Sequence, residues 1–320
     1  MSHFSNPDYI VIGSGSSGST IAYRLGESGA NQVLVLEFGG TDMGPFIQMP
    51  AALSYPMNMS RYDWGYKAEP EQNLNGRSIV CPRGKVIGGS SSINGMIYVR
   101  GNPGDYHHWA KNGATSWDYK DVLPYFQRME TSNGFLSEFR GHKGPLQVSR
   151  GKRDNPLHEA FVKASEEAGY TPTEDYNGYR QEGFGPADMT VWRGSRFSAA
   201  KAYLRPALKK KNVQLLTGAL VDKIIFENQK AVGVQFTHKG QTKIIRVKKD
   251  IVLSAGSINS PTILQRSGIG NGDLLKKLGI SVLNHLPGVG ENLQDHLEVY
   301  FQVKCLQPIT LYKYLNPFSK

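Results

Sequence analysis

Continuous apolar runs separated by glycine-rich turns predict buried strands at the start of the chain. Tyr9 to Ile12 and Val33 to Leu36 are each apolar throughout, which is typical of strands buried on both faces. Between them, Ile21, Ala22 and Leu25 recur on one face of a predicted helix. The order strand, helix, strand predicts a βαβ unit and therefore an α/β fold.

The hydrophobic pattern changes further along the chain. Helices are predicted over Asp118 to Met129 and, more clearly, over Asn155 to Gly169. Alternating apolar and polar residues predict strands over Val213 to Leu220, Val221 to Phe226, Ala231 to Phe236 and the basic run Thr242 to Val247. A last alternating strand is predicted to begin over Leu297 to Cys305.

A second strand, turn and helix is predicted after the alternating strands. Asp250 to Ala255 has the buried-strand pattern and leads directly to Gly256. Ser260 and Pro261 are predicted as the N-cap and the first residue of a helix. This unit can return to the sheet that the first βαβ unit begins. By contrast, Phe38 to Asn75 has many aromatic residues and no clear periodicity, so we expect a long ordered excursion.

The turn after the first strand carries the chemistry of a dinucleotide site. Its sequence, Gly13-Ser14-Gly15-Ser16-Ser17-Gly18, has the spacing of a dinucleotide fingerprint. Gly13 permits the tight turn, Gly15 lets the backbone approach a pyrophosphate, and Gly18 lets the helix pack closely on the strand. The backbone N–H groups at the helix N-terminus, around Ser16 and Ser17, offer hydrogen-bond donors to the phosphates. Because strand, turn and helix occur together, an ordinary αβ turn is the poorer interpretation.

Glu37, at the end of the second apolar run, completes this pattern. It lies 22 residues after Gly15, where a carboxylate can accept hydrogen bonds from both hydroxyls of an adenosine ribose. The same negative charge would repel a 2′-phosphate, so NADP is disfavoured.

Composition and charge restrict the class of protein further. The 320 residues suffice for one large or two ordinary domains, and the 36 glycines agree with nucleotide-binding turns. No apolar run approaches the ~20 residues needed to span a bilayer, and the fingerprint begins too early to leave room for a removed leader. With only Cys81 and Cys305, a reducing compartment is expected. The net charge of +10 comes from scattered basic residues, which predicts a solvated surface and no nucleic-acid partner, with weak membrane-surface contact as an alternative.

A second glycine-bearing segment, Cys81 to Gly101, also indicates close approach to a ligand. Gly88 and Gly89 are followed by three serines, among them Ser91, and then by Asn94. Paired glycines remove side chains that would hold the backbone away from a flat, wide ring. Serine hydroxyls and the asparagine amide can donate hydrogen bonds to phosphate oxygens or to a ring edge. A Gly/Ser hairpin without a ligand would not explain these residues beside the fingerprint.

Three segments together resemble one known family. GKVIGGSSSINGMIYVRGNPGDYH (Gly84 to His107) and GSINSPTILQRSGIG (Gly256 to Gly270) are similar to the two signature patterns of the glucose-methanol-choline (GMC) oxidoreductases, which use FAD to oxidise alcohols. PGVGENLQDHLEVY (Pro287 to Tyr300) resembles the same family. Stretches between them, such as RYDWGYKAEPE and RFSAAKAYLRPAL, are similar to its choline-oxidising members. The resemblance covers almost the whole chain from Asp8 onward.

The resemblance implies a fold and a cofactor. It implies a Rossmann-like FAD-binding domain of GMC type over residues 1–150 and 194–297, with a smaller α+β substrate domain over residues 151–193 that begins again at 298–320. Asn94 is expected beside the flavin, and the backbone of Val221 beside the adenine. Some choline-oxidising relatives attach FAD covalently through a histidine immediately before that asparagine. Here the residue is Ile93, so the FAD is expected to be non-covalent.

The resemblance also implies a reaction, the oxidation of choline to betaine aldehyde by hydride transfer to flavin N5, which can continue to glycine betaine. The family's catalytic histidine motif lies C-terminal to the segments seen here. Catalytic residues are therefore expected beyond Lys320, none is assigned in this chain, and the chain alone is expected to be inactive. The pair His107-His108 has no metal-ligand spacing around it, and His296 is interpreted as structural.

One acidic residue is a candidate for substrate recognition. The quaternary ammonium of choline cannot donate hydrogen bonds, so a carboxylate and aromatic faces must recognise it. Glu298 sits where choline-oxidising relatives place such a carboxylate; a solvated strand acid is the alternative. Trp64, Tyr55 and Tyr300 are candidate walls of an aromatic cage, or else core or cofactor-side packing.

Other interpretations stay open. The chain can be another alcohol dehydrogenase or oxidase of the same family, or a non-catalytic FAD-binding remnant. A NAD-dependent dehydrogenase is disfavoured by the two additional flavin-family segments. A respiratory electron acceptor is the expected partner besides the alcohol. The expected location is the cytoplasmic side, with peripheral contact at the inner membrane as the alternative.

Overall fold

The computed structural model describes residues 5–311 except residues 135, 153 and 297. Contacts divide the chain into two compact units: unit 1 comprises Met1–Met96 and Val191–Gln294, and unit 2 comprises Ile97–Thr190 and Asp295–Lys320. The predicted domains and these units differ most at the first boundary, which the sequence places near residue 150 and the contacts place after Met96. The other two changes of unit fall within a few residues of the predicted positions.

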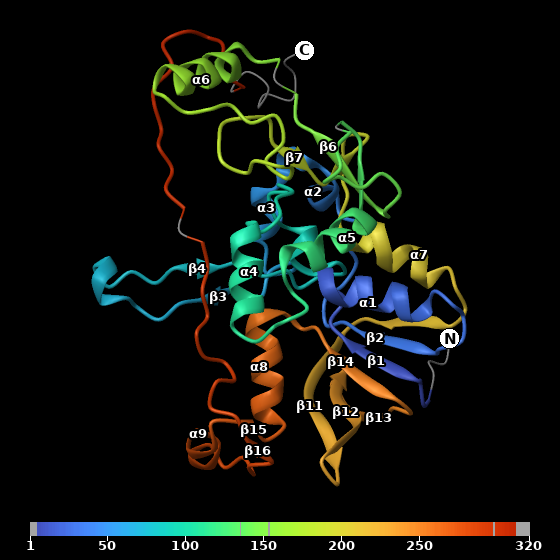
Figure 1. The fold of residues 1–320 in the computed structure, drawn as a ribbon. Coiled ribbons are helices and arrows are strands. Elements are labelled where there is room, and N and C mark those ends of the chain that lie inside the picture. The colour runs from blue at the N-terminus through green and yellow to red at the C-terminus, as the bar shows by residue number, and fades with distance from the viewer. Residues whose placement is uncertain (1–4, 135, 153, 297, 312–320) are drawn as a thin grey trace. The chain divides into compact units, whose positions relative to one another are not determined.

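A four-stranded parallel sheet lies at the centre of unit 1 (Figure 1). Its strands follow the order β10 (Val213–Leu216), β2 (Val33–Leu36), β1 (Tyr9–Ile12) and β14 (Asp250–Leu253). In β1, Tyr9 pairs with Val33 on one side and with Asp250 on the other. Helix α1 (Ser16–Gly26) joins β1 to β2. The predicted βαβ unit and the predicted return of the second strand–turn–helix unit to the same sheet are both confirmed.

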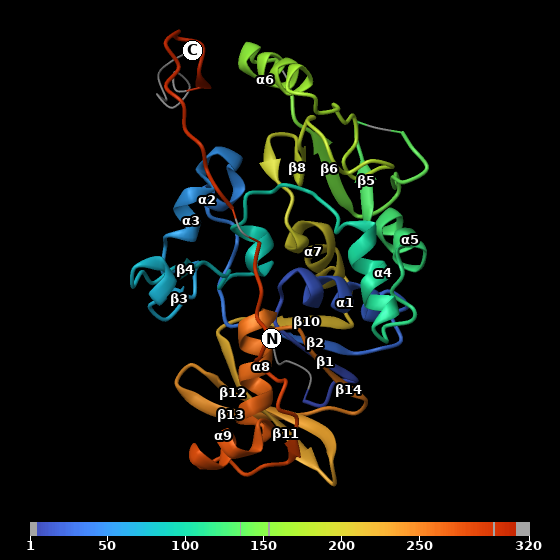
Figure 2. The same ribbon diagram turned by 60° about the vertical axis from the view of Figure 1, so that its left-hand side comes forward.

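Alternate residues of β1 and β2 face two different layers of unit 1. The even-numbered residues pack against the antiparallel strands β11 (Ala219–Glu227) and β12 (Lys230–His238) and against helix α8 (Gly256–Arg266). The odd-numbered valines pack against α1 and α7 (Arg205–Leu208). Figures 1 and 2 accordingly show α1 on one side of the parallel sheet and the sheet that contains β11 and β12 on the other. Both faces of the central strands are therefore buried, which explains their unbroken apolar sequences.

Short elements complete unit 1 and support the loops between the main strands. They are α2 (Pro45–Gln48), a 3₁₀ turn (Pro50–Ala52), α3 (Ser54–Met57), β3 (Tyr66–Lys67), a 3₁₀ turn (Gln72–Leu74), β4 (Val80–Cys81), a 3₁₀ turn (Gly89–Ser92), β8 (Val191–Trp192), β9 (Ser195–Arg196), a π-helical turn (Ala200–Leu204), β13 (Gln241–Arg246), β15 (Ile269–Gly270), α9 (Gly272–Lys277) and β16 (Asn284–His285).

Unit 2 combines helices with short strands, as the predicted α+β class requires. Its elements are α4 (Pro103–Lys111), α5 (Tyr119–Met129), β5 (Glu130–Ser132), β6 (Leu146–Arg150), α6 (Pro156–Glu167) and β7 (Asp188–Met189), with β5, β6 and β7 in one small sheet. The two predicted helices are confirmed as α5 and α6, whereas α4 was not predicted although Asn102 and Asp105 form a capping box at its start. Within the described ranges of both units, no helix has the length and hydropathy required to cross a membrane.

Two predicted strands need correction. The single strand predicted over Val213 to Leu220 is two strands, because β10 ends at Leu216 and β11 begins in a different sheet. Gly218 lies between them with a positive φ of 69°, a conformation that glycine adopts freely and that turns the chain from one sheet to the next. The strand predicted over Leu297 to Cys305 is not formed at residues 298–305, and Leu297 lies outside the described residues. Alternation alone does not make a strand, since a strand also needs a neighbour for its ladder hydrogen bonds.

Candidate cofactor-binding site

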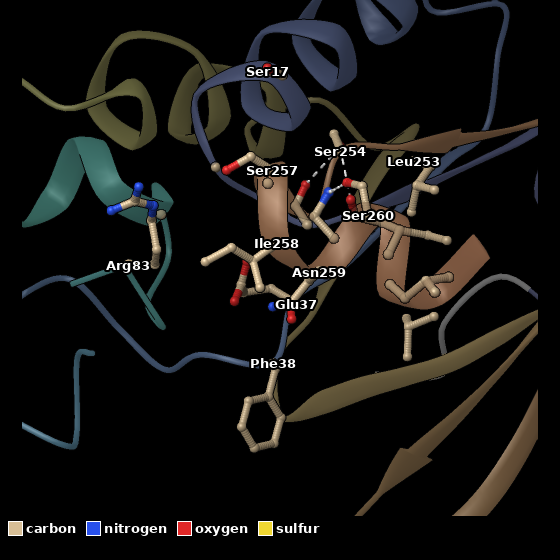
Figure 3. A pocket seen from close by; sticks show the side chains of 18 of the residues that line it. Ser17, Glu37, Phe38, Arg83, Leu253, Ser254, Ser257, Ile258, Asn259 and Ser260 are labelled. Carbon is tan, nitrogen blue, oxygen red and sulfur yellow. Dashed lines mark hydrogen bonds between the residues drawn. The ribbon is translucent and has the colours of Figure 1, made fainter. Parts of the chain in front are cut away.

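A cavity of about 800 Å³ opens in unit 1 where β1, β2 and β14 end. Ligands of open parallel sheets bind at these carboxyl ends. Figure 3 shows side chains that surround the cavity: Ser17 from α1, Glu37 and Phe38 after β2, Arg83, and several residues at the start of α8. The predicted cofactor residues that line it are Gly13, Gly15, Ser16, Ser17, Glu37, Gly89 and Val221. Residues predicted from distant parts of the sequence therefore meet at one cavity.

The glycines of the first loop are required by close packing. Gly13 has a φ of 92°, and a Cβ added there would lie 2.5 Å from the carbonyl oxygen of Ser254. A Cβ at Gly18 would clash with the carbonyl oxygen of Gly13, so only glycine lets α1 lie this close to the end of β1. Gly18 itself is buried and does not line the cavity.

The N-terminus of α1 is available to an anion. Gly15 is the N-cap, its turn has no side-chain cap, and the first turn holds no acidic residue. Ser16 and Ser17 are exposed and line the cavity. The first backbone N–H groups of an α-helix have no partner within the helix, so those at this end can bind phosphate oxygens.

Glu37 is a buried carboxylate that the protein itself holds in place. Only 7% of the residue is exposed. Its Oε2 accepts hydrogen bonds from the N–H and the hydroxyl of Ser14, both at 2.8 Å, and its Oε1 accepts one from the N–H of Gly39 at 2.7 Å. Burial raises the pKa of Glu37, and the hydrogen bonds from Ser14 and Gly39 oppose that rise. Since a carboxylate has about four acceptor positions, Glu37 keeps capacity for a ligand hydroxyl.

Three aromatic rings line another side of the cavity. Trp64 stacks on Phe38 with ring centroids 5.2 Å apart and on Tyr66 at 6.0 Å. The hydroxyl of Tyr66 donates a 2.6 Å hydrogen bond to Oδ1 of Asn259 in α8, and burial raises the pKa of Tyr66. Trp64 therefore lies among the nucleotide-loop residues, which favours cofactor-side packing over a substrate cage. Tyr55, the second cage candidate, is exposed and stacks on Phe46.

The second glycine loop meets the first one directly. The N–H of Gly88 donates to the carbonyl oxygen of Ser14 at 3.0 Å. A Cβ at Gly89 would lie 2.7 Å from Cα of Gly15, so two glycine backbones pass at close range. Because the two loops touch, they form one site rather than two.

The polar side chains of the second loop are used within the protein. The hydroxyl of Ser91 donates to the carbonyl oxygen of Gly88 at 2.6 Å and accepts from the N–H of Ala199 at 3.0 Å. Oδ1 of Asn94 accepts from the N–H of Met96 and from Nη1 of Arg196. Neither Gly88, Ser91 nor Asn94 is among the residues that line the cavity. Their contact with a cofactor stays a prediction, and their observed role is to shape the loop.

Comparison with known proteins identifies the family. A family model described as GMC oxidoreductase matches residues 7–298. The chain belongs to the GMC oxidoreductase family. It is 58% identical over 313 residues to the oxygen-dependent choline dehydrogenase of Brucella anthropi and 56% identical over 311 residues to that of Rhizobium meliloti. These matches cover 98% and 97% of this chain but only 57% and 56% of the relatives, so the chain spans little more than half their length.

Two solved structures share the fold with this chain. Pyridoxine 4-oxidase from Mesorbium loti is 33% identical with a TM-score of 0.84, over 88% of this chain and 56% of that one. An FAD-dependent oxidoreductase from Chaetomium thermophilum is also 33% identical, with a TM-score of 0.81, over 88% of this chain and 51% of that one. The predicted Rossmann-like fold is thus confirmed, and FAD is the cofactor of the family. These features fit such a dinucleotide. The free N–H groups at the start of α1 and the glycines beside them suit the pyrophosphate, and the buried carboxylate of Glu37 suits the ribose.

The start of α8 contributes a wall of the GMC site that the sequence did not predict. Residues 253–260 line the cavity, including Gly256 at the first position of the helix. The prediction of Ser260 and Pro261 as N-cap and first helical residue is wrong, since the helix begins five residues before Pro261. Ser260 instead reaches back, and its hydroxyl oxygen accepts the N–H of Ala255 at 3.1 Å. The sequence signal for the true start was Gly256, which follows the end of β14 by three residues and has a φ of 85°.

The predicted substrate carboxylate, Glu298, belongs to unit 2. It is exposed, and its Oε2 accepts a 2.6 Å hydrogen bond from the hydroxyl of Tyr300, which raises the pKa of Tyr300. His296 lies two residues earlier, and its N–H donates to Oδ1 of Asp295 at 2.9 Å. The substrate roles of Glu298 and Tyr300 remain predictions.

Proposed function

We propose that the chain binds FAD non-covalently in the unit 1 cavity and serves the oxidation of choline to betaine aldehyde. The observation that carries the cofactor assignment is the contact of the two glycine loops beside Glu37. The substrate assignment is supported by the names of the curated relatives, which are choline dehydrogenases. Because the chain spans little more than half of those relatives, the activity is proposed for the protein in which this segment functions.

The chain's own residues would hold the parts of FAD as follows. The N–H groups at the start of α1 would donate to the pyrophosphate, and Glu37 would accept from the ribose hydroxyls. Val221, which is buried at the cavity wall, would meet the adenine. The second glycine loop would bring backbone against the flavin ring. FAD, when bound, supplies the hydride acceptor for alcohol oxidation.

Ile93 supports non-covalent attachment. It is 2% exposed and packs with Ile47, Tyr62 and Val86 in a hydrophobic cluster. An aliphatic side chain has no nucleophile with which to attach a flavin. The position at which some relatives carry a histidine is therefore occupied by core packing.

Recognition of choline would use the negative charge of Glu298. A quaternary ammonium has no hydrogen to donate, and an opposite charge or an aromatic face must bind it. The hydrogen bond between Tyr300 and Glu298 holds an aromatic ring next to that carboxylate. This pair offers both kinds of contact within three residues of sequence.

A substrate pair tests the proposal. The whole protein in which this segment functions is assayed with choline or with 3,3-dimethylbutanol, an uncharged analogue of nearly the same shape, in the presence of an artificial electron acceptor. We expect choline to be oxidised. Glu298→Gln should raise the KM for choline about tenfold, which corresponds to about 1.4 kcal/mol. It should change the KM for the uncharged analogue less than twofold, because only choline carries the positive charge. Equal losses for both substrates would make Glu298 structural. Bound flavin without any turnover of choline would instead favour a non-catalytic FAD-binding protein.

The electron acceptor is a separate part of the proposal. The sequence resemblance favours a respiratory acceptor, whereas the relatives are named oxygen-dependent. Oxygen consumption during choline oxidation distinguishes the two. Stoichiometric uptake of oxygen would support direct reoxidation by oxygen, and its absence in a chain that reduces an artificial acceptor would support the respiratory partner.

A further inference from the structure

Arg196, in β9, is buried. None of the described residues that accept its hydrogen bonds carries a charge. Only 1% of the residue is exposed. Its Nε donates to the carbonyl oxygen of Ile47 at 2.8 Å, and its Nη1 donates to the carbonyl oxygen of Asn94 at 2.7 Å. Further acceptors of Nη1 are Oδ1 of Asn94 at 3.0 Å and the carbonyl oxygen of Ser91 at 3.3 Å. Every one of these acceptors is electrically neutral.

The charge of Arg196 is therefore hydrogen-bonded but not neutralised. Burial lowers the pKa of Arg196 to about 10, so the guanidinium stays protonated at neutral pH. Its Nη2 is buried and has no hydrogen-bond partner within the described chain. A cation on the same segment, Lys201, donates to the carbonyl oxygen of Arg196 at 2.7 Å and adds positive charge. Burying an ion among neutral groups costs free energy, so a purely structural bridge would be better made by a neutral side chain.

The position of Arg196 connects it to the second glycine loop. Its acceptors Ser91 and Asn94 follow Gly88 and Gly89, and Gly89 lines the cavity against Gly15. The planar guanidinium donates at once to Ile47 and to the loop of Ser91 and Asn94, which a lysine ammonium cannot do in one plane. Removing it would leave the side chain and carbonyl of Asn94 without this restraint.

We propose that Arg196 is a positioning residue for the cofactor: it fixes Asn94 and the second glycine loop, and its unneutralised charge favours the more negative, reduced state of the group bound there. This inference rests on the proposed function, since it concerns FAD in the same cavity. The positioning of the loop and the effect of the charge depend on different properties of the side chain. The several N–H donors of the planar guanidinium (the fork) fix the loop geometry. The positive charge, by contrast, acts over a distance in an interior from which water is largely excluded.

Two substitutions at Arg196 separate fork from charge. Arg196→Lys keeps the charge and loses the fork, and Arg196→Met loses both. Each variant is titrated with FAD to obtain a dissociation constant, and the flavin is then equilibrated with a redox dye of known potential. We expect both variants to bind FAD at least fivefold more weakly. At a fixed dye potential we expect the ratio of reduced to oxidised flavin to fall about tenfold in Arg196→Met and less than threefold in Arg196→Lys.

An exposed cation supplies the matched control. Arg246→Met removes the same charge from an ion pair with Glu227 in which both side chains are half exposed. It should change neither the dissociation constant nor the redox ratio by more than twofold. If Arg196→Met binds FAD and keeps the parent's redox ratio, the proposal is wrong while the proposed function stands. If the parent chain itself takes up no FAD, the proposed function fails, and this inference fails with it.

A double-mutant cycle keeps the test decisive if Arg196→Met does not fold. Asn94→Ala removes the side chain that Arg196 holds, and Arg196→Lys is combined with it. If Arg196 acts through Asn94, the two losses in FAD affinity are not additive, and the double variant binds about as well as Asn94→Ala alone. Fully additive losses would show that Arg196 does not act through the Asn94 side chain.

Discussion

The buried charges of unit 2 and two buried charges of unit 1, Glu37 and Arg196, are satisfied in opposite ways. In unit 2, Arg140 pairs with Glu130 at 2.8 Å, with Asp175 at 2.8 Å and with Asp188 at 2.7 Å, and Arg100 pairs with Glu130 at 3.0 Å. In unit 1, Glu37 is held by donors of neutral residues, Ser14 and Gly39, and Arg196 by neutral acceptors. Charges that pair cancel one another, whereas charges held by neutral groups keep their field.

This difference indicates which buried charges serve structure and which serve a ligand. In the unit 2 network, the attraction between opposite charges offsets the free-energy cost of removing them from water. The network also connects the loop around Asp175 to the sheet that contains Glu130 and Asp188. Glu37 and Arg196 each lie beside one glycine loop and have opposite signs, whereas the third buried charge of unit 1, Asp42, pairs with Arg205 at 2.7 Å. We interpret Glu37 and Arg196 as the polar framework of the cofactor site, because uncompensated buried charges gather where proteins bind ligands.

The largest expected effect follows from breaking the unit 2 network. Arg140→Met leaves Glu130, Asp175 and Asp188 buried without their main cation, which should lower the free energy of unfolding by about 3–5 kcal/mol. Urea-induced unfolding followed by circular dichroism measures this. The control is Arg246→Met, whose pair with Glu227 is 53% exposed on both sides and should cost less than about 1 kcal/mol. Similar losses for Arg140→Met and Arg246→Met would contradict the distinction between the buried and the exposed pairs.

A smaller effect is expected at the first glycine loop. Ser14→Ala removes a hydroxyl that donates to the Glu37 carboxylate, and hydrogen bonds to charged groups contribute about 1.5–3 kcal/mol. Ser19→Ala is the matched control, since its hydroxyl is equally buried but donates to the neutral carbonyl oxygen of Ser14 at 2.7 Å, a bond worth about 0.5–1.5 kcal/mol. Urea midpoints of the two variants should therefore rank Ser14→Ala as the less stable. The reverse order would mean that Glu37 is not ionised in the folded chain.

The smallest effect is a pH dependence at Glu37. The pKa of Glu37 is raised in the folded chain from the ordinary value of 4.5. Between pH 4.5 and the folded-state pKa, the carboxyl therefore keeps in the folded state a proton that it releases in the unfolded state. The contribution of Glu37 to stability is then fully present below pH 4.5 and is lost as the pH rises through the folded-state pKa. Relative to Glu37→Gln, which cannot titrate, the parent should lose at most about 1.4 kcal/mol per pH unit in that window. A difference between the two that does not change with pH would show that burial does not shift this carboxyl.

The sequence predicted the central sheet and the first loop because both depend on local features. Unbroken apolar runs identify strands that are buried on both faces, and the spacing of the glycines in the first loop is a local motif. Gly18, for example, is required by the carbonyl oxygen of Gly13. The same reasoning identified Glu37 from its distance to Gly15, although not that Ser14 holds it.

The features that the sequence did not predict depend on partners far along the chain. Arg196 looks like an ordinary basic residue until Ile47 and Asn94 surround it. The hydrogen bond between Tyr66 and Asn259 joins residues 193 positions apart. The strand expected from Leu297 failed for the same reason, since alternation predicts a strand only where a neighbour is present. Contacts between distant residues thus determine which side chains surround the cavity, whereas local sequence patterns determine the strands of the central sheet.

The central claim is that two touching glycine loops form one non-covalent FAD site. The most direct measurement is a titration of the purified chain with FAD, followed by acid precipitation and an absorbance spectrum of both fractions. We predict saturable uptake of one FAD per chain and release of the flavin into the supernatant, because Ile93 offers no group for a covalent bond. A chain that takes up no FAD, or that keeps its flavin in the pellet, would contradict the account.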